Sequence, residues 1–457
     1  MKRTLLISIA LLLSAGASAQ DFMAGAAKVD ITPKESDLIN KTDIIRDKIQ
    51  VKAVYMTDGT TPAVIVTVDG DARTLADAIE RASKQTGCPE ANFWVCGTHS
   101  HSAQTNGIGP GGHPSYEQVQ NAVVEAAVKA KANMVPVRVG YAKTQVDLNV
   151  NRDNYNDQLA WSQSANWTAP CDKDLTVLAF LDGNDVPVAV LMNYAMHPVN
   201  FFMSGVVSSD FPGDATTYIE NLFGGNTVAL FTQGASGDVN PKMAYTHMFQ
   251  KGQVKGVLPG PKSKGNLDTS KNPVFKSEEV AADELDAHKE VIRRKDEYVK
   301  MLGWSLGNNA VMAMHYNMSF EKNPKIWTGE TVITCPGRER IDKNGRENYD
   351  PGYKPADDVE IGVGLLRIGD IAVATVCGEV YTEIGLRLKN ESPAAKTMFV
   401  TLADGSYESG YIYSDKASHH LTFQVIGSNL QPGYAEDGII DAFHKLYDES
   451  KKQLFRQ

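Results

Sequence analysis

Short apolar runs that end abruptly in polar loops containing glycine or proline are the feature that most constrains this chain. The runs are rich in Val and Ile, and such runs predict buried strands because branched side chains pack well on a pleated sheet. They occupy residues 24–33, 63–68, 92–96, 137–141, 176–181, 186–194, 227–232, 361–368 and 371–376. Helical periodicity appears at residues 75–85, 115–133, 213–222 and 277–315. We therefore expect an α/β fold in which layered mixed β-sheets are flanked by helices.

Composition and charge narrow the class of protein. The chain has 457 residues, of which 42% are hydrophobic and 22% are charged, as is typical of a globular protein with a large core. The formal net charge is -10, and Lys and Arg are scattered, which argues against nucleic acid as a partner. After the N-terminus no apolar run approaches the ~20 residues of a transmembrane helix. The sequence contains no signal for an oligomeric state.

The N-terminal residues have the pattern of a secretory signal peptide. Lys2 and Arg3 precede an apolar run over residues 5–13, and a small-residue site of the A-x-A type ends at Ala19. A membrane anchor is the alternative, but the run is too short for a span. We expect residues 1–19 to be removed after Ala19 and the mature protein, residues 20–457, to be secreted or periplasmic.

One internal segment and the cysteines carry structural predictions. Residues 251–275 are rich in Gly, Lys and Pro and lack periodicity, which predicts a mobile surface insertion, either a plain linker or a lid. Elsewhere residues 20–457 show no clean domain boundary. The chain has five cysteines, and export permits disulfides. Cys171 and Cys335 lie in proline-flanked loops and are candidates for a pair.

Two strand ends deliver histidines. A buried run leads directly into Thr-His-Ser-His-Ser, which places His99 and His101 two residues apart. Residues i and i+2 of an extended segment project to one side, so two imidazoles can reach one metal ion. A second apolar run ends at His197, before a proline. Solvent-facing loop histidines and a structural histidine are the alternatives, and two such junctions in one chain favour a zinc site.

Two further strand ends carry polar groups. The run ending at residue 232 opens into a Gly-rich loop that contains Asp238 and Asn240. Backbone N–H groups of such a loop can approach a ligand, although a tight turn capped by Asp238 is the alternative. The run 371–376 is followed by Cys-Gly and then Glu379. A carboxylate that completes two imidazoles is a frequent catalytic zinc set, while a helix N-terminal acid is the alternative.

Seven motifs in order carry a resemblance to a known family. They are Ala-Lys-Val-Asp-Ile-Thr-Pro, Thr-His-Ser-His-Ser, Asn-Arg-Asp, His-Pro, Ser-Asp-Phe-Pro-Gly, Gly-Asp-Val-Asn-Pro and Gly-Glu-Val. Together, from about residue 23 to the C-terminus, the chain resembles the catalytic domain of the neutral/alkaline ceramidases. The resemblance implies the fold of that domain and a zinc-dependent amidase. The additional C-terminal β-domain of full-length ceramidases is expected to be absent.

The resemblance also implies a ligand set. His99, His197 and Glu379 resemble zinc ligands, and Tyr411 resembles the tyrosine ligand, with Tyr413 as the neighbouring alternative. Three further residues are expected to act on the substrate. His101 and Arg152 match residues that stabilise charge on the substrate carbonyl, and Asn240 stands where the family has Ser. Phe423 stands where the family has a second catalytic tyrosine, and His419 and His420 are candidates to compensate.

The expected function is cleavage of an amide (N-acyl) bond by zinc-activated water. The departures at Asn240 and Phe423 leave the substrate open among a small molecule, a lipid amide and a glycan. One alternative is a zinc enzyme that acts on acidic sugars by hydrolysis or elimination, with Arg152 pairing the sugar carboxylate. Another is a binding protein without catalytic activity.

Overall fold

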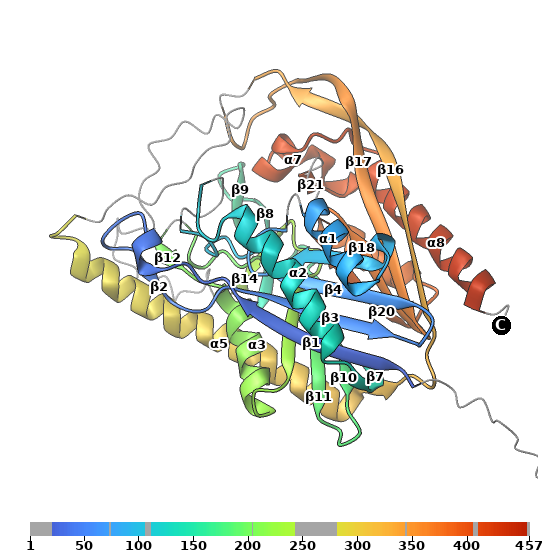
Figure 1. Ribbon diagram of the computed structural model, residues 1–457. Helices are drawn as coiled ribbons and strands as arrows, with labels where there is room; N and C mark the ends of the chain where they lie inside the picture. The colour runs from blue at the N-terminus through green and yellow to red at the C-terminus, as the bar shows by residue number, and fades with distance from the viewer. Residues whose placement is uncertain are drawn as a thin grey trace, which may run out of the picture.

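Three β-sheets that share one apolar core form the centre of the molecule (Figure 1). The computed structural model describes residues 21–72, 75–105, 111–202, 204–242, 281–342, 345–404 and 410–454. The common core contains Ile65 from the first sheet, Leu191 from the second and Leu366 from the third. Side chains of this kind alternate along each strand, so every sheet turns one apolar face inward.

The first two sheets each have five strands. The first has the order β5-β4-β3-β1-β6, and the second has the order β13-β11-β10-β7-β15. Their bounds are β1 Met23–Asp30, β3 Gln50–Thr57, β4 Pro62–Val68, β5 Phe93–Gly97, β6 Val135–Pro136, β7 Arg138–Gln145, β10 Asp174–Leu181, β11 Pro187–Tyr194, β13 Val228–Gln233 and β15 Ser319–Phe320. In each sheet one pair is parallel, β4 with β5 and β11 with β13, and the other pairs are antiparallel.

The third sheet has four strands in the order β16-β17-β18-β20. Its strands are β16 Ile326–Arg340, β17 Tyr353–Ile368, β18 Ile371–Val376 and β20 Lys396–Thr401, with β18 and β20 parallel. Smaller sheets join β14 Val239–Pro241, β8 Asn149–Tyr155 and β9 Trp161–Asn166, pair β2 Ile44–Ile45 with β12 Val206–Val207, and pair β19 Glu379–Val380 with β21 Tyr411–Ile412.

Helices cover the outer faces of the three large sheets (Figure 1). Helices α1 Ala76–Thr86 and α2 Tyr116–Ala132 cover the first sheet, and α3 Asp210–Leu222 and α5 Leu285–Asn317 cover the second. Helices α6 Thr382–Glu391 and α8 Ala435–Leu454 cover the third, and the short α7 Phe423–Gly427 lies beside β21. The prediction of layered mixed sheets flanked by helices is confirmed.

Most predicted elements match the structure closely. The capping box of α2 is present, since the Ser115 hydroxyl accepts from the Gln118 N–H and the Gln118 side chain accepts from the Ser115 N–H. β17 begins at Tyr353 instead of residue 361, and β16 was not expected, because charged and glycine residues interrupt its apolar pattern. No helix among the described residues is long and apolar enough to cross a membrane. Residues 1–20 and 251–275 lie outside the described residues.

The suggested pairing of Cys171 with Cys335 is wrong. Both are free thiols, as are the other three cysteines. Cys335 does not lie in a loop: it is buried within β16, opposite Val359 of β17. The adjacent proline marks an irregularity in the pairing between Cys335 and Gly337, which imitates a loop in the sequence.

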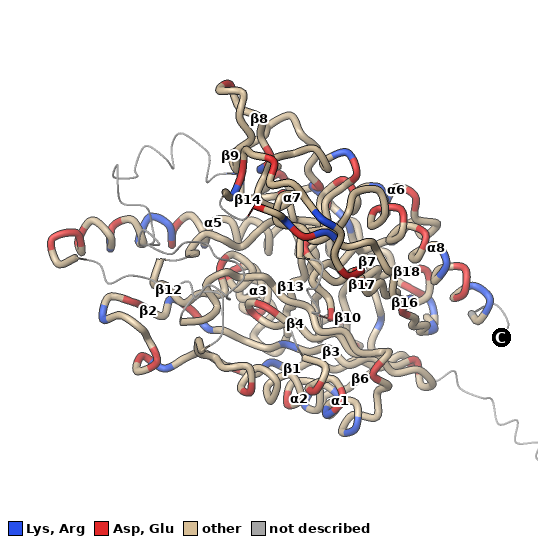
Figure 2. Tube along the Cα trace, turned by 90° about the horizontal axis from the view of Figure 1, so that it is seen from above, with Lys and Arg blue, Asp and Glu red and all other residues tan. Residues whose placement is uncertain are grey.

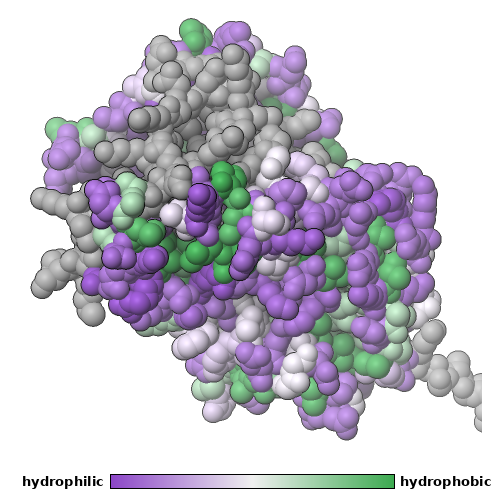
Figure 3. Space-filling view, turned by 60° about the vertical axis from the view of Figure 1, so that its left-hand side comes forward, coloured by the Kyte–Doolittle hydropathy of each residue, from purple (hydrophilic) through white to green (hydrophobic). Residues whose placement is uncertain are grey.

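The surface carries charges of both signs. Figure 2 shows Lys and Arg interspersed with Asp and Glu along the described elements, with no extended face of one sign. The face in Figure 3 is mainly hydrophilic, with a few hydrophobic patches between the polar residues. The apolar runs of the sequence are therefore buried mainly in the cores between sheets and helices.

Candidate metal centre

His99 and His101 follow the buried strand β5 at the carboxyl end of its parallel pair with β4. The strand ends at Gly97, and the His99 N–H donates to the Gly70 carbonyl at 2.8 Å. His99 has φ 66°, in the left-handed region, which costs roughly 1–3 kcal/mol for a residue with a side chain. The two imidazoles meet, with 3.2 Å between their Nε2 atoms. The predicted proximity is correct, but a left-handed turn produces it and not an extended segment.

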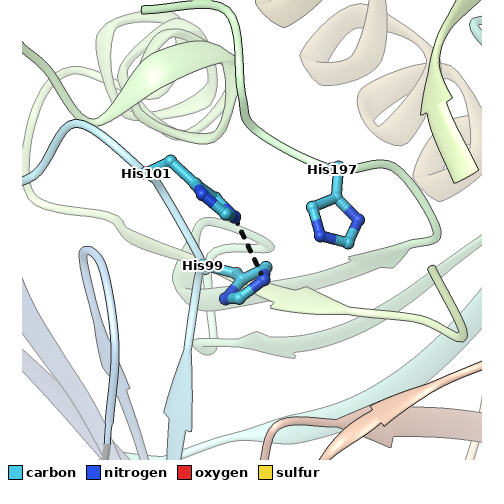
Figure 4. A group of neighbouring side chains, drawn as sticks. All are labelled: His99, His101 and His197. Carbon is cyan, nitrogen blue, oxygen red and sulfur yellow. Dashed lines mark hydrogen bonds between the residues drawn. The ribbon is translucent and has the colours of Figure 1, made fainter. Parts of the chain in front are cut away.

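His197 approaches the same point from the end of β11 (Figure 4). Its backbone N–H donates to the Val239 carbonyl at 3.1 Å, and its Nδ1 lies 2.8 Å from the Ser236 carbonyl. A carbonyl only accepts, so Nδ1 carries the proton and Nε2 keeps its lone pair. Candidate ligand atoms of His99, His101 and His197 all lie within 4.8 Å of one another.

Glu379 adds a carboxylate to the three imidazoles. Its Oε2 lies 3.1 Å from Nε2 of His197 and 3.3 Å from Nε2 of His99. It comes from β19, which follows β18 after a left-handed Gly378. Burial alone would raise the pKa of Glu379, but the adjacent His99 and His197 outweigh it and hold that pKa well below its usual range. Glu379 is therefore an anion that faces two ring nitrogens.

Arg152 and Tyr411 lie beside this group. The Arg152 guanidinium donates to Asn240 Oδ1 at 3.1 Å, to the Gly237 carbonyl at 2.7 Å and to the Tyr411 hydroxyl at 3.2 Å. Burial and the nearby charge of Glu379 raise the pKa of Tyr411. Arg152 is only 2% exposed, so its charge is held inside the protein by these bonds.

The two histidine rings that can be assigned a protonation state are neutral near pH 7. Burial, together with Arg152, lowers the pKa of His197 to about 4. Burial and the two neighbouring imidazoles lower the pKa of His101 well below its usual value. Neutral imidazole is the form that binds a metal ion.

The Gly237–Asp238 turn connects the segments that carry the site residues. The Gly237 N–H donates to the Val380 carbonyl at 2.8 Å, and a Cβ at Gly237 would lie 2.7 Å from the Glu379 carbonyl oxygen. Asp238 Oδ1 accepts from the Thr382 N–H at 2.8 Å, and Oδ2 accepts from Asn151 Nδ2 at 2.7 Å. Asp238 also bonds to its own backbone N–H, as the tight-turn alternative expected, in addition to these two longer-range bonds. It ties the Asn-Arg-Asp strand to the segment that carries Glu379.

The remaining predicted residues make their contacts outside the group of three histidines. Tyr413 points away from the histidines, because its hydroxyl donates to the Leu430 carbonyl at 2.6 Å. The Phe423 ring lies 5.5 Å from the Tyr411 ring. His420 contacts Asp153 at 3.2 Å and stacks on Trp161 at 4.0 Å, so this interaction holds it to β8 and β9. His419 lies at 4.9 Å from the His420 ring and is exposed.

Sequence reasoning missed several supporting residues. No recognisable sequence signal marks the Ser236 carbonyl, Gly237 or Phe202 individually. The Phe202 ring lies 5.2 Å from the ring of His101. Only the Gly-rich character of the loop after β13 pointed to a close backbone approach. The structure also places His101 in the candidate metal group, as the His-x-His spacing predicted, whereas the family resemblance implies a role toward the substrate.

The nitrogen and oxygen donors of these four side chains, three imidazoles and one carboxylate, suit a divalent cation. Three imidazoles and a carboxylate from three segments of the chain converge, and neutral imidazole and carboxylate are donors that zinc accepts. The bond from His197 Nδ1 to a backbone carbonyl is the kind of support that orients a metal-binding histidine. The residues therefore fit a metal ion at this position.

Known proteins resemble this chain in sequence and in fold. The family model of neutral/alkaline non-lysosomal ceramidases, N-terminal, matches residues 41–337. Neutral ceramidase B of Dictyostelium discoideum is 28% identical over 177 residues, covering 33% of this chain and 24% of that protein.

Two solved structures resemble the chain as a whole. A ceramidase complexed with C2 has a TM-score of 0.64 at 14% identity, covering 96% of this chain and 76% of that chain. The neutral ceramidase from Pseudomonas aeruginosa has a TM-score of 0.62 at 14% identity, covering 94% of this chain and 74% of that chain. These likenesses concern the fold. By its sequence match over residues 41–337, the chain belongs to the neutral/alkaline non-lysosomal ceramidase family.

Proposed function

We propose that this protein is an exported zinc-dependent amidohydrolase that cleaves an N-acyl bond. The convergence of His99, His197 and Glu379 on one point carries the proposal, because these groups come from three strand ends far apart in sequence. The ceramidase names of its relatives support an amide substrate. We assign residues 1–19 to a signal peptide and residues 20–457 to one catalytic domain, with a secreted or periplasmic location.

His99, His197, Glu379 and Tyr411 are the residues we assign to zinc. Zinc bound by such a set lowers the pKa of a coordinated water to about 7 and polarises a carbonyl group. The low pKa of His197 and of Glu379 keeps both residues in the forms that bind a cation. Glu379 and His197 therefore need not lose a proton at pH 7 to bind the ion.

His101 and Arg152 act from the protein side. His101 is neutral, so one ring nitrogen carries a proton that it can donate to the carbonyl oxygen of the substrate. A preorganised donor to a developing oxyanion contributes roughly 3–4 kcal/mol to lowering the barrier. Arg152 donates to Tyr411 and therefore fixes that phenol, while its charge remains close to the reacting group. Asn240 accepts from Arg152 and orients it.

This bonding disfavours the acidic-sugar alternative in its original form. A buried Arg152 that already donates to Asn240, Gly237 and Tyr411 is poorly placed to pair with the carboxylate of a sugar. Hydrolysis is therefore the reaction we propose. Addition of water to the carbonyl carbon breaks the C–N bond and yields a carboxylate and a protonated amine.

Metal analysis combined with an amide screen tests the proposal. We expect one zinc per chain by mass spectrometry and release of fatty acid from ceramide or from simpler N-dodecanoyl amides, with loss of activity in chelator. Zinc without turnover on any amide would support a binding protein instead. N-terminal sequencing of the exported protein tests cleavage after Ala19.

A further inference from the structure

The solvent exposure of the site's side chains indicates the side from which a substrate can reach them. His99, His197 and Arg152 are buried, whereas His101, Glu379 and Tyr411 are partly exposed. A substrate must therefore approach past the partly exposed groups. Phe202 lies against His101, at 5.2 Å between rings. Phe423 lies against Tyr411, at 5.5 Å between rings.

Phe423 connects the site to an exposed cation. The Arg346 guanidinium lies 4.4 Å from the centre of the Phe423 ring, and Arg152 lies 5.5 Å from that same ring. Arg346 is exposed, and among the described residues it forms no hydrogen bond or ion pair. Its planar donors are therefore available to a ligand, whereas those of Arg152 bond within the protein.

Hydrogen bonds and ring stacking among three segments of the chain hold the loop that carries Arg346. The Asn348 N–H donates to the Leu421 carbonyl at 2.7 Å, and Asn348 Oδ1 accepts from the Trp161 N–H at 3.2 Å. Trp161 in turn stacks on His420 at 4.0 Å. These bonds fix the position of the loop two residues after Arg346. The loop that carries the Arg346 guanidinium is therefore held beside the site by these contacts.

We propose that Arg346 binds an anionic group, a carboxylate, sulfate or phosphate, on the amine part of the substrate. This rests on the proposed function. The acyl part then lies toward the apolar Phe202, and the amine part toward Phe423 and Arg346. Glu347 follows Arg346, but its Oε2 is buried, and among the described residues no ion pair joins the two side chains. Phe423 offers a ring and no hydroxyl, so recognition on this side depends on the guanidinium.

A matched pair of amides tests the inference. N-dodecanoylglycine and N-dodecanoylethanolamine share their acyl chain and differ mainly in the charge of the amine part. We expect the wild-type protein to have the higher kcat/KM on the glycine conjugate. In Arg346→Gln that value should fall about tenfold, through KM, because a charged hydrogen bond is lost at an exposed position. The value for the ethanolamine conjugate should not change.

The chain offers a matched control. Arg138 also lies over a phenylalanine, Phe320, at 4.3 Å, but on β7 and paired with Asp185. Arg138→Gln should leave both amides unaffected, and Arg346→Lys should restore part of the preference. An equal loss on both amides in Arg346→Gln, or no preference in the wild type, overturns the inference while leaving the amidase proposal intact.

A binding measurement distinguishes a failure of this inference from a failure of the proposed function. If the wild type hydrolyses neither amide, calorimetry with N-dodecanoylglycine still reports on Arg346. Binding that is about tenfold weaker in Arg346→Gln would support the subsite. Equal binding by both proteins, or no binding by either, would overturn it.

Discussion

Replacing Gly237 by alanine tests how the candidate site is held together. A Cβ at this position would lie 2.7 Å from the Glu379 carbonyl oxygen, 3.0 Å from Cδ1 of Tyr381 and 3.1 Å from the Val380 carbonyl carbon. Ordinary contacts begin at 3.4 Å, so the backbone of Glu379 must move by about 0.7 Å relative to Gly237. Overpacking of this kind costs roughly 1–3 kcal/mol of stability.

The same movement should reduce activity. Because a misplacement of ~1 Å can reduce the rate of an enzyme ~100-fold, we expect Gly237→Ala to lose at least about tenfold in kcat/KM. Urea denaturation and hydrolysis of an N-dodecanoyl amide are the assays. Gly183→Ala is the control, since nothing lies within 4 Å of its Cβ and the change should be neutral or slightly stabilising. Wild-type stability and activity in Gly237→Ala would refute the close approach.

Four further predictions follow from the site and the cysteines. His99→Ala and His197→Ala should each lose bound zinc and activity, and full zinc content in both would contradict the assignment. Arg152→Ala should keep zinc while its rate falls on the order of 100-fold; metal content and kcat separate the two effects. In the metal-free protein burial lowers the pKa of His197 from 6.5 to about 4, so the unfolded state binds more protons between these values. The free energy of unfolding in urea should therefore decrease by up to about 3 kcal/mol from this residue as pH falls through that window, and His197→Asn should make the slope shallower, with His101 and His288 supplying the remainder. Thiol titration of the unreduced, unfolded protein should find Cys171 and Cys335 both free, and a thiol count reduced by two would contradict this.

The strand ends were predictable because two local signals coincide there. A run of Val and Ile must be buried, and a His or Glu placed directly after it must find a partner near the sheet edge. The carboxyl ends of β5 and β11 therefore located His99 and His197 correctly as neighbours. Parallel pairing at both strands brings these ends to one side of their sheets, as ligand sites in α/β proteins require.

Other features depend on contacts that leave no local trace. Asp238 bonds to Thr382, which lies 144 positions further along the chain, and Asn151 lies 87 positions before it. β16 mixes glycine, proline and charged residues, so its pairing with β17 could not be read from periodicity. The same irregularity disguised Cys335 as a loop residue. In each case tertiary packing overrides the local pattern.

In the function that we propose, the residues that hold the metal are fixed separately from the residues that select the substrate. His197 is fixed by two backbone carbonyl contacts, and the backbone of Glu379 is fixed by the close approach of Gly237, so neither depends on the side chain at position 240. Asn240 instead contacts Arg152, and Phe423 lies on the accessible side with Arg346. Changes at these two positions can therefore redirect substrate recognition while the metal-binding geometry persists. A divergent member of a ceramidase family can keep its hydrolytic chemistry and act on a different amide.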